Sequence, residues 1–266
     1  MTSSLLFWGC SSAWLERLPV TQEAAGSSPV TPAKNLFCIY MYKKEFSNLN
    51  KTYTNHLYSG FLGFFFKKNH ELMENNINQL KNKSNIQILE IGGGATPHIN
   101  FLKHSYKNYY SIDIDENDEL ENFYKNNYSE IKYQKFNGIN IPFENNFFDR
   151  IIISHCLEHI LNPEKFLFEM LRVCKPEGII SIALPTDPGF FWRLGRFFIK
   201  KFIQKKTHKL TDLDYDYVNA IEHVNSIFNL RTIIKKKFNI KSEIFYPLNL
   251  KCIDLNLFYI VQLIKK

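Results

Sequence analysis

The segment Ile88–Gly94, with the sequence ILEIGGG, decides the fold of this chain. Its apolar run is typical of a buried strand, and three consecutive glycines end that strand. Glycine allows a sharp turn of the backbone and the close approach of a ligand, because a Cβ atom at that point would collide with it. A structural turn or a nicotinamide-nucleotide site would look similar, although the third glycine of G-x-G-x-x-G would fall at Pro97.

Strand-like and helix-like stretches alternate on the carboxyl side of this segment. We expect strands over residues 86–91, 108–114, 148–154 and 179–184, and two more over 240–246 and 255–264. Apolar side chains at helical spacing predict helices over 163–174 and 226–237, and a helical stretch through 99–102. Such alternation predicts a parallel sheet built from βα units.

The composition excludes several classes of protein. A hydrophobic fraction of 45% in 266 residues, with 24 Phe and 14 Tyr, is ample for a globular core and argues against disorder. The longest apolar run, Phe61 to Phe66, is far shorter than the roughly 18–20 residues that a membrane span needs. The net charge of +7 comes from scattered lysines, so we attribute it to compositional bias, with a basic binding surface as the alternative.

The number and spacing of the cysteines bear on the cellular compartment of the protein. Five widely spaced cysteines without a CxxC pair are typical of a reducing compartment, and we expect a cytoplasmic protein.

Residues 1–40 differ in composition from the rest and can be back-translated into the T arm, acceptor stem and D arm of a transfer-RNA gene. We therefore expect 1–40 to be a spurious extension and Met41 to be the natural start.

From Asn85 to Pro185 the chain resembles the class I S-adenosylmethionine-dependent methyltransferases. Residues 90–94 match the E/D-x-G-x-G first motif of that family. The resemblance implies that S-adenosylmethionine is the cofactor. It also implies that Glu90 lies near the methionine moiety, and that Gly92, Gly93 and Gly94 pass beneath the nucleoside.

Asp113 lies 19 residues after Gly94, at the end of the second expected strand. A carboxylate at about this distance can accept hydrogen bonds from both ribose hydroxyls of a nucleoside. Asp115 has the same chemistry, but the alternation of a strand directs it to the other side. We therefore prefer Asp113.

Two later segments complete the expected cofactor site. Residues 137–143 resemble the family's D-x-x-x-L-P-F segment, which binds adenine, with Asn137 in place of the aspartate and Gly138 beside it. An amide oxygen can still accept a hydrogen bond from the adenine amino group. Ser154 and His155 are expected at the rim of the cofactor pocket. Glu177 is a second departure, since the family commonly has glycine there.

Residues 155–159 match the H-x-x-E-H pattern of one class of zinc peptidases. That pattern requires a helix and a further carboxylate ligand, whereas here it directly follows a buried strand. At this position the methyltransferase family carries L-E-H. We therefore expect Glu158 and His159 to begin or cap a helix, and we expect no metal site.

A helix beginning near residue 190 separates aromatic from basic side chains. Phe191, Leu194, Phe198 and Phe202 would share one face, with the cations Arg193, Arg196 and Lys200 opposite. An ordinary helix packed on the core explains this pattern. A substrate lid or a peripheral membrane contact through 190–206 is the functional alternative.

The resemblance implies an α/β fold, a Rossmann-like doubly wound sheet of seven strands with an antiparallel last strand. We expect a helical N-terminal cap over 41–85 and a methyltransferase domain over 86–266. Within that domain, 186–239 would be a substrate-side insertion after the fifth strand and 240–266 the last two strands.

The predicted function is methyl transfer from S-adenosylmethionine to a small-molecule, sugar or lipid acceptor. His155 and His223 are the candidates for a base at the acceptor. The alternatives are a nucleic-acid or protein methyltransferase, and a non-catalytic relative that only binds the cofactor. No nucleic-acid partner is expected, because no recognition domain or N-P-P-Y-like motif is visible.

Overall fold

The computed structural model describes residues 60–81, 83–114, 119–198, 200–201, 213, 216, 219–220 and 223–265. The predictions made for residues 1–40 and 41–59, and for Asp115 and Phe202, fall outside the described residues.

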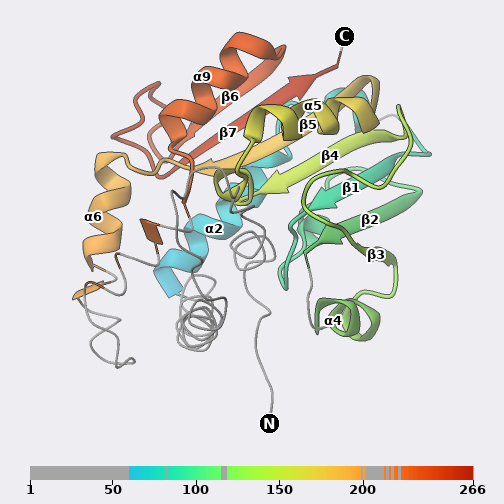
Figure 1. Cartoon of the computed structure of the whole chain (residues 1–266), viewed down its shortest axis with the longest axis horizontal. Coiled ribbons are helices and arrows are strands. Elements are labelled where there is room, and N and C mark those ends of the chain that lie inside the picture. The colour runs from blue at the N-terminus through green and yellow to red at the C-terminus, as the bar shows by residue number, and fades with distance from the viewer. Residues whose placement is uncertain are drawn as a thin grey trace, which may run out of the picture.

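A seven-stranded sheet in the order β3-β2-β1-β4-β5-β7-β6 forms the centre of the structure (Figure 1). The first five strands pair in parallel, and β7 runs antiparallel to both β5 and β6. The strands are β1 (Gln87–Ile91), β2 (Asn108–Asp113), β3 (Ile131–Lys135), β4 (Phe148–Ser154), β5 (Cys174–Pro185), β6 (Ile240–Tyr246) and β7 (Phe258–Ile264). This arrangement confirms the predicted Rossmann-like fold.

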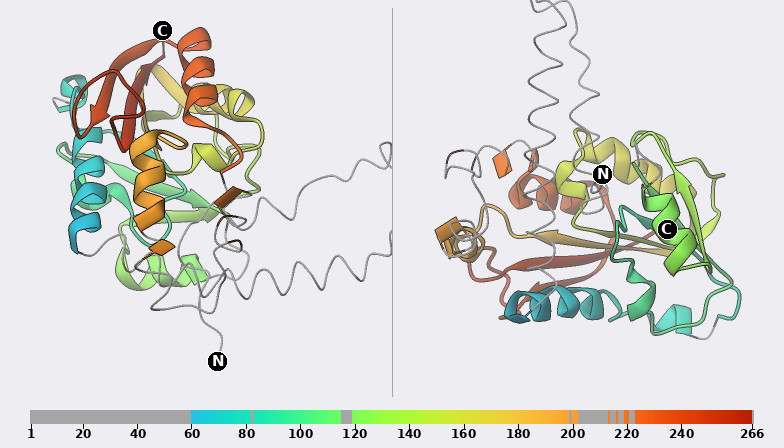
Figure 2. Two further views of the ribbon diagram at one scale, coloured as in Figure 1. Left: turned by 90° about the vertical axis from the view of Figure 1, so that its left-hand side faces the viewer. Right: turned by 90° about the horizontal axis from the view of Figure 1, so that it is seen from below.

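Helices cover both faces of the sheet (Figure 2). One face carries α5 (Pro163–Val173) and α9 (Ile227–Lys237), and the other carries α2 (Gly60–Met73), with α3 (Asn78–Lys81) and α4 (Glu119–Asn127) packed into the same core. Asn162 caps α5 by accepting a hydrogen bond from the Lys165 N–H, and Pro163 occupies its first turn.

The alternation of side chains along the strands explains why the sheet has two cores. Leu89, Ile151 and Ile153 pack beneath α5 and α9, whereas Ile88 and Ile152 pack beneath α2. Successive strand side chains point to opposite faces, so a parallel strand buried on both sides is apolar throughout. This is why the central strands read as continuous apolar runs in the sequence.

Two local elements differ from their predicted form. The helical stretch expected through 99–102 is a short 3-10 helix, η2 (His98–Phe101), which Pro97 precedes. The segment expected to begin a helix after β4 is another 3-10 turn, η3 (Leu157–His159), and the helix α5 starts only at Pro163. In both turns buried histidines take part in polar contacts, which the short turns accommodate.

The helix predicted near residue 190 is α6 (Phe190–Phe198), which lies beyond the carboxyl end of β5 (Figure 1). None of its residues is fully buried. Among the described residues, no helix is both long and apolar enough to cross a membrane.

A buried ionic network holds α2 and its following turn against the sheet. The Arg150 guanidinium on β4 lies 2.6 Å from the Glu74 carboxylate, and both side chains are fully buried. The same Glu74 oxygen accepts a hydrogen bond of 2.7 Å from His98 Nε2, and the second oxygen accepts from the Lys103 N–H at 2.9 Å. Burial opposes ionisation of Glu74, but His98 and Arg150 outweigh it and lower its pKa to about 2.

We predict that Glu74→Gln lowers the free energy of unfolding by about 3–5 kcal/mol, because it leaves the Arg150 charge buried without its counter-ion. Urea unfolding monitored by circular dichroism measures the change. Glu71→Gln is the matched control, since Glu71 pairs with Lys68 at the surface of α2 and its substitution should have little effect. Equal, small losses in both variants would contradict the assigned role of the network.

Candidate active site

The turn after β1 adopts a conformation that suits glycine. Gly92 and Gly94 have φ angles of 71° and 53°, in the left-handed region that other residues rarely adopt. The Gly92 N–H donates to the carbonyl of Ile112 on β2 at 2.9 Å, and the Gly94 N–H donates to the Asp113 carboxylate at 3.2 Å. The turn is therefore tied to the end of β2.

Gly93 is required for a different reason. A Cβ atom at this position would lie 2.8 Å from Cδ of Glu90 and 2.9 Å from the Tyr124 hydroxyl. Contacts this short would force both side chains to move. Gly93 therefore lets the turn pass directly over the Glu90 carboxyl group.

Glu90 is buried at the end of β1 and has two hydrogen-bond donors. Its oxygens accept from the Tyr109 hydroxyl at 2.8 Å and from the His98 N–H at 2.8 Å. Burial raises the pKa of Glu90 to about 7, even though the two donors favour its ionised form. A cationic group near this carboxyl, such as the ammonium of a methionine moiety, would favour ionisation.

Asp113 is fully buried at the carboxyl end of β2. Its second oxygen accepts from the Ile114 N–H at 2.7 Å, so the two backbone contacts fix the orientation of the carboxylate. A carboxylate can accept about four hydrogen bonds in all. The structure thus places Asp113 beside the glycine turn, where the sequence analysis expected it.

Asn137 and Gly138 form a tight turn after β3. The Asn137 side-chain oxygen accepts from the N–H groups of Ile139 and Asn140 at 2.9 and 3.0 Å, and Gly138 has a φ of 72°. The oxygen that was expected to accept from adenine thus also stabilises this turn. Adenine recognition by Asn137 stays a prediction.

Ser154 and His155 lie at the carboxyl end of β4, beneath α2. Asn69 of α2 lies 3.5 Å from the Ser154 hydroxyl and 3.2 Å from His155 Nε2. The His155 ring packs against Phe66 and Phe258, with ring centroids 5.4 and 5.2 Å away. Burial, followed by the nearby His223, lowers the pKa of His155 to about 3.

A second polar group lies beyond the end of β5 and includes His223. Its Nδ1 donates to the Asp187 carboxylate at 2.6 Å, and Arg196 of α6 lies 2.5 Å from the same oxygen. Burial opposes ionisation of Asp187, but His223 and Arg196 reverse this effect and hold its pKa below the usual range. The sequence analysis missed Asp187, although its position directly after a core strand was a usable signal.

Arg196, which was predicted on the face of α6 opposite the aromatic residues, does not extend into solvent. Its guanidinium turns toward the end of β5 and pairs with the mostly buried Asp187 carboxylate. Phe190, Phe197 and Phe198 of α6 are about half exposed, at 50%, 54% and 49%. Lys200 is paired with Asp216 at 2.5 Å.

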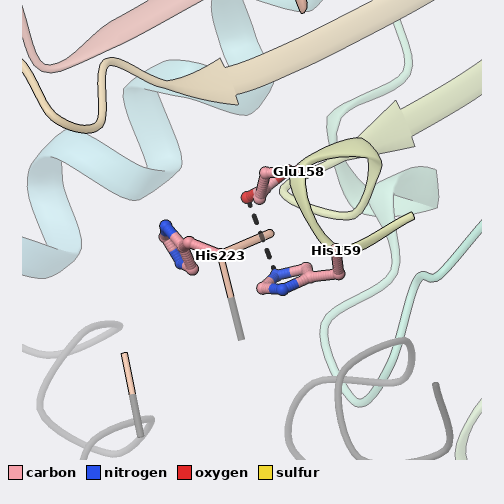
Figure 3. A group of neighbouring side chains, drawn as sticks. All are labelled: Glu158, His159 and His223. Atoms are coloured by element: carbon pink, nitrogen blue, oxygen red, sulfur yellow. Dashed lines mark ion pairs between the residues drawn. The ribbon is translucent and has the colours of Figure 1, made fainter. Parts of the chain in front are cut away.

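Glu158 and His159 of η3 lie next to His223, and the three side chains converge (Figure 3). Their potential metal-ligating atoms all lie within 4.8 Å of one another. Glu158 is buried, and its pKa is raised to about 8, mainly by burial and further by the charge of Asp187. His155 Nδ1 also lies 3.8 Å from the Glu158 carboxylate.

The segment before α9 is fixed against both neighbouring loops. The Asn225 side chain donates to the Ile160 carbonyl at 2.6 Å, and its backbone N–H donates to the Glu158 carbonyl at 3.0 Å. The Ile227 N–H donates to the Asp187 carbonyl at 2.8 Å. These bonds bring His223, which is remote in sequence, to η3 and to the end of β5.

Comparisons with known proteins identify the family of the domain. Residues 89–182 match the family model of the methyltransferase domain. A demethylmenaquinone methyltransferase of Corynebacterium urealyticum is 43% identical over 56 residues, which are 20% of this chain and 24% of that protein. A ubiquinone/menaquinone biosynthesis C-methyltransferase of Vibrio cholerae is 36% identical over 58 residues, 22% of each chain. The chain thus spans less than a quarter of the length of these curated relatives.

Solved structures share the fold at low sequence identity. A protein of Pyrococcus horikoshii is 16% identical with a TM-score of 0.50, covering 76% of this chain and 91% of its own. A structure from Galdieria sulphuraria, described as a candidate sarcosine dimethylglycine methyltransferase, is 14% identical with a TM-score of 0.53. It covers 77% of this chain and 88% of its own.

A sheet of this order, with a glycine turn after β1 and a buried carboxylate at the end of β2, defines a nucleotide-binding α/β domain. The match over residues 89–182 identifies it further. The chain carries a class I S-adenosylmethionine-dependent methyltransferase domain.

We predict that His155→Asn makes stability less dependent on pH. A neutral buried histidine with a pKa near 3 contributes stability above its unfolded pKa of 6.5, and that contribution is lost as the pH falls from 6.5 toward 3. Wild type should therefore lose about 1.4 kcal/mol per pH unit more than the variant in this window. Asparagine tolerates the φ of 50° at this position.

Urea unfolding of both proteins at pH 7, 6, 5 and 4 gives the comparison. The difference between the two curves isolates His155 from the other buried histidines. Parallel curves would contradict the prediction, because they would show that the pKa of His155 is the same in the folded protein as in the unfolded chain.

Proposed function

We propose that this protein transfers the methyl group of S-adenosylmethionine to a small, lipid-like acceptor. The observation that supports S-adenosylmethionine as the cofactor is the buried Asp113 carboxylate, which is bonded to the glycine turn. There it would accept hydrogen bonds from both ribose hydroxyls. Gly92, Gly93 and Gly94 would then pass beneath the nucleoside. Glu90 would face the methionine moiety, Asn137 and Gly138 the adenine, and Ser154 the rim of the pocket.

Methyl transfer is an in-line displacement at the sulfonium carbon, so alignment of the acceptor supplies much of the rate. We place the acceptor beside the polar group of Asp187, Arg196 and His223. These residues follow β5 at the same carboxyl edge of the sheet as the glycine turn. Burial lowers the pKa of both imidazoles, but the hydrogen bond to Asp187 opposes the shift of His223, whereas the nearby His223 lowers the pKa of His155 further, so we assign the acceptor contact to His223.

The lipid-like class of the acceptor rests on two supports. The curated relatives are named for quinone methylation, although they match only a short part of their length. The half-exposed aromatic side chains of α6 also supply apolar surface next to Asp187. A peripheral membrane contact through 190–206 is part of the same proposal. A sugar acceptor and another small molecule are the other members of the class predicted from the sequence.

We predict that cofactor binding depends on Asp113 and Gly94. Asp113→Ala removes the hydrogen bonds to the ribose and should cost on the order of 1–3 kcal/mol of binding free energy. Gly94→Val should abolish binding, because a branched side chain at this positive φ distorts the turn and fills the space for the nucleoside. Calorimetric titration with S-adenosylhomocysteine measures both, and unchanged affinity in the two variants would contradict the assigned site.

The acceptor class is tested with methyl-labelled cofactor. Purified protein is incubated with cell extract separated into organic-soluble, aqueous small-molecule and macromolecular fractions. We expect label in the organic-soluble fraction, and none there with Gly94→Val. Label confined to protein or nucleic acid would contradict the proposal and support the macromolecular alternative.

A further inference from the structure

Three side chains from two separate segments form a cluster with the composition of a metal site. Glu158 and His159 belong to η3, and His223 lies before α9 (Figure 3). The Glu158 carboxylate lies 3.8 Å from His159 Nε2, and all three ligand atoms lie within 4.8 Å of one another. Ligand atoms of a tetrahedral zinc site are about 3.3–3.5 Å apart, given metal–ligand distances of 2.0–2.2 Å. Small side-chain rotations would close the site.

The Glu158 carboxylate lacks the partners that a buried acid normally has. Among the residues the structure describes, no other residue donates a hydrogen bond to either of its buried oxygens. Buried polar groups in proteins are almost always satisfied, and each exception requires an explanation such as an ion. A cation bound between Glu158 and the two imidazoles would supply that partner.

The hydrogen bond to Asp187 fixes the tautomer of His223 that can bind a metal. Because His223 Nδ1 donates its proton to the Asp187 carboxylate at 2.6 Å, Nε2 of the neutral ring carries no proton and can bind a metal. A carboxylate that orients a metal-binding histidine in this way is a general feature of metal sites.

We propose that Glu158, His159 and His223 bind a divalent transition-metal ion such as Zn²⁺, and that the ion holds a hydroxyl oxygen of the methyl acceptor. Two imidazoles and one carboxylate leave a position open for such an oxygen. A bound cation lowers the pKa of a coordinated hydroxyl, so the proton is released to solvent and the oxygen becomes more electron-rich. The contact between the metal ion and the methyl acceptor rests on the proposed function, whereas the metal site itself does not.

The sequence analysis expected no metal because it considered residues 155–159 as a helical ligand set. The structure offers a different set, in which His223 from a remote segment takes the third place and His155 packs against Phe66 and Phe258. Only the fold brings these residues together, so no local motif could have revealed the cluster.

Titration of the metal-free full-length protein with Co²⁺, followed by visible absorption, tests the site without cofactor or acceptor. We expect one Co²⁺ per chain with the intense visible bands of four-coordinate cobalt, and displacement of these bands by Zn²⁺. Calorimetry with Zn²⁺ gives the affinity. A wild-type protein with no such bands and no stoichiometric Zn²⁺ binding would overturn the proposal.

Variants then assign the ligands. Glu158→Gln and His223→Gln should abolish stoichiometric binding, and Asp187→Asn should weaken it by about 10–100-fold. Glu164→Gln is the matched control, since it makes the same charge change in an exposed pair with Lys237 and should bind as wild type does. Circular dichroism verifies that each variant is folded. Binding that is unchanged in both Glu158→Gln and His223→Gln would overturn the assignment.

The proposed contact between the metal ion and the methyl acceptor is tested by a separate measurement. Once an acceptor is identified, chelation should raise its KM at least tenfold while the affinity for S-adenosylhomocysteine stays unchanged. Stoichiometric metal binding with an unchanged KM after chelation would overturn the proposed contact with the acceptor and leave the metal site standing. A wild-type protein that does not bind S-adenosylhomocysteine would instead show that the proposed function is wrong.

Discussion

The Asp113 carboxylate accepts a hydrogen bond from the Gly94 N–H, and this contact joins the end of β2 to the turn after β1. The bond requires the left-handed backbone of Gly92 and Gly94, and it requires Gly93 to pass over Glu90 without a side chain. Because β1 lies between β2 and β4, its turn is positioned by both neighbouring strands at the carboxyl edge of the sheet. The cofactor and acceptor groups are arranged around this one point.

Two buried polar systems lie on either side of that point and have different roles. The Glu74–Arg150 pair holds α2 and its following turn against the sheet, and His98 connects it to Glu90 through its backbone N–H. The group around Asp187 lies where the chain after β5 returns toward η3. Its buried, incompletely satisfied Glu158 carboxylate is costly unless it serves binding, which is why we assign function there.

Local sequence signals predicted most strands of the sheet and the glycine turn after β1. Apolar runs predicted β1, β2, β4 and β7, because most of their side chains are buried, and they also predicted the partly buried β6. β3 was not identified as a strand, since it lies at the sheet edge and its buried and exposed residues alternate. The Asp187–His223 pair and the inward turn of Arg196 could not be predicted, because they depend on how the segment after β5 packs against η3. Packing between segments that are far apart in the chain produces no periodic pattern of residues in the sequence.

A crystal structure of the protein with S-adenosylhomocysteine tests the central claim most directly. The account predicts both ribose hydroxyls within hydrogen-bond distance of the Asp113 carboxylate, with the nucleoside lying over Gly92–Gly94. It also predicts that the homocysteine moiety lies near Glu90. A nucleoside bound away from the glycine turn, or ribose hydroxyls that contact other groups and not Asp113, would contradict it.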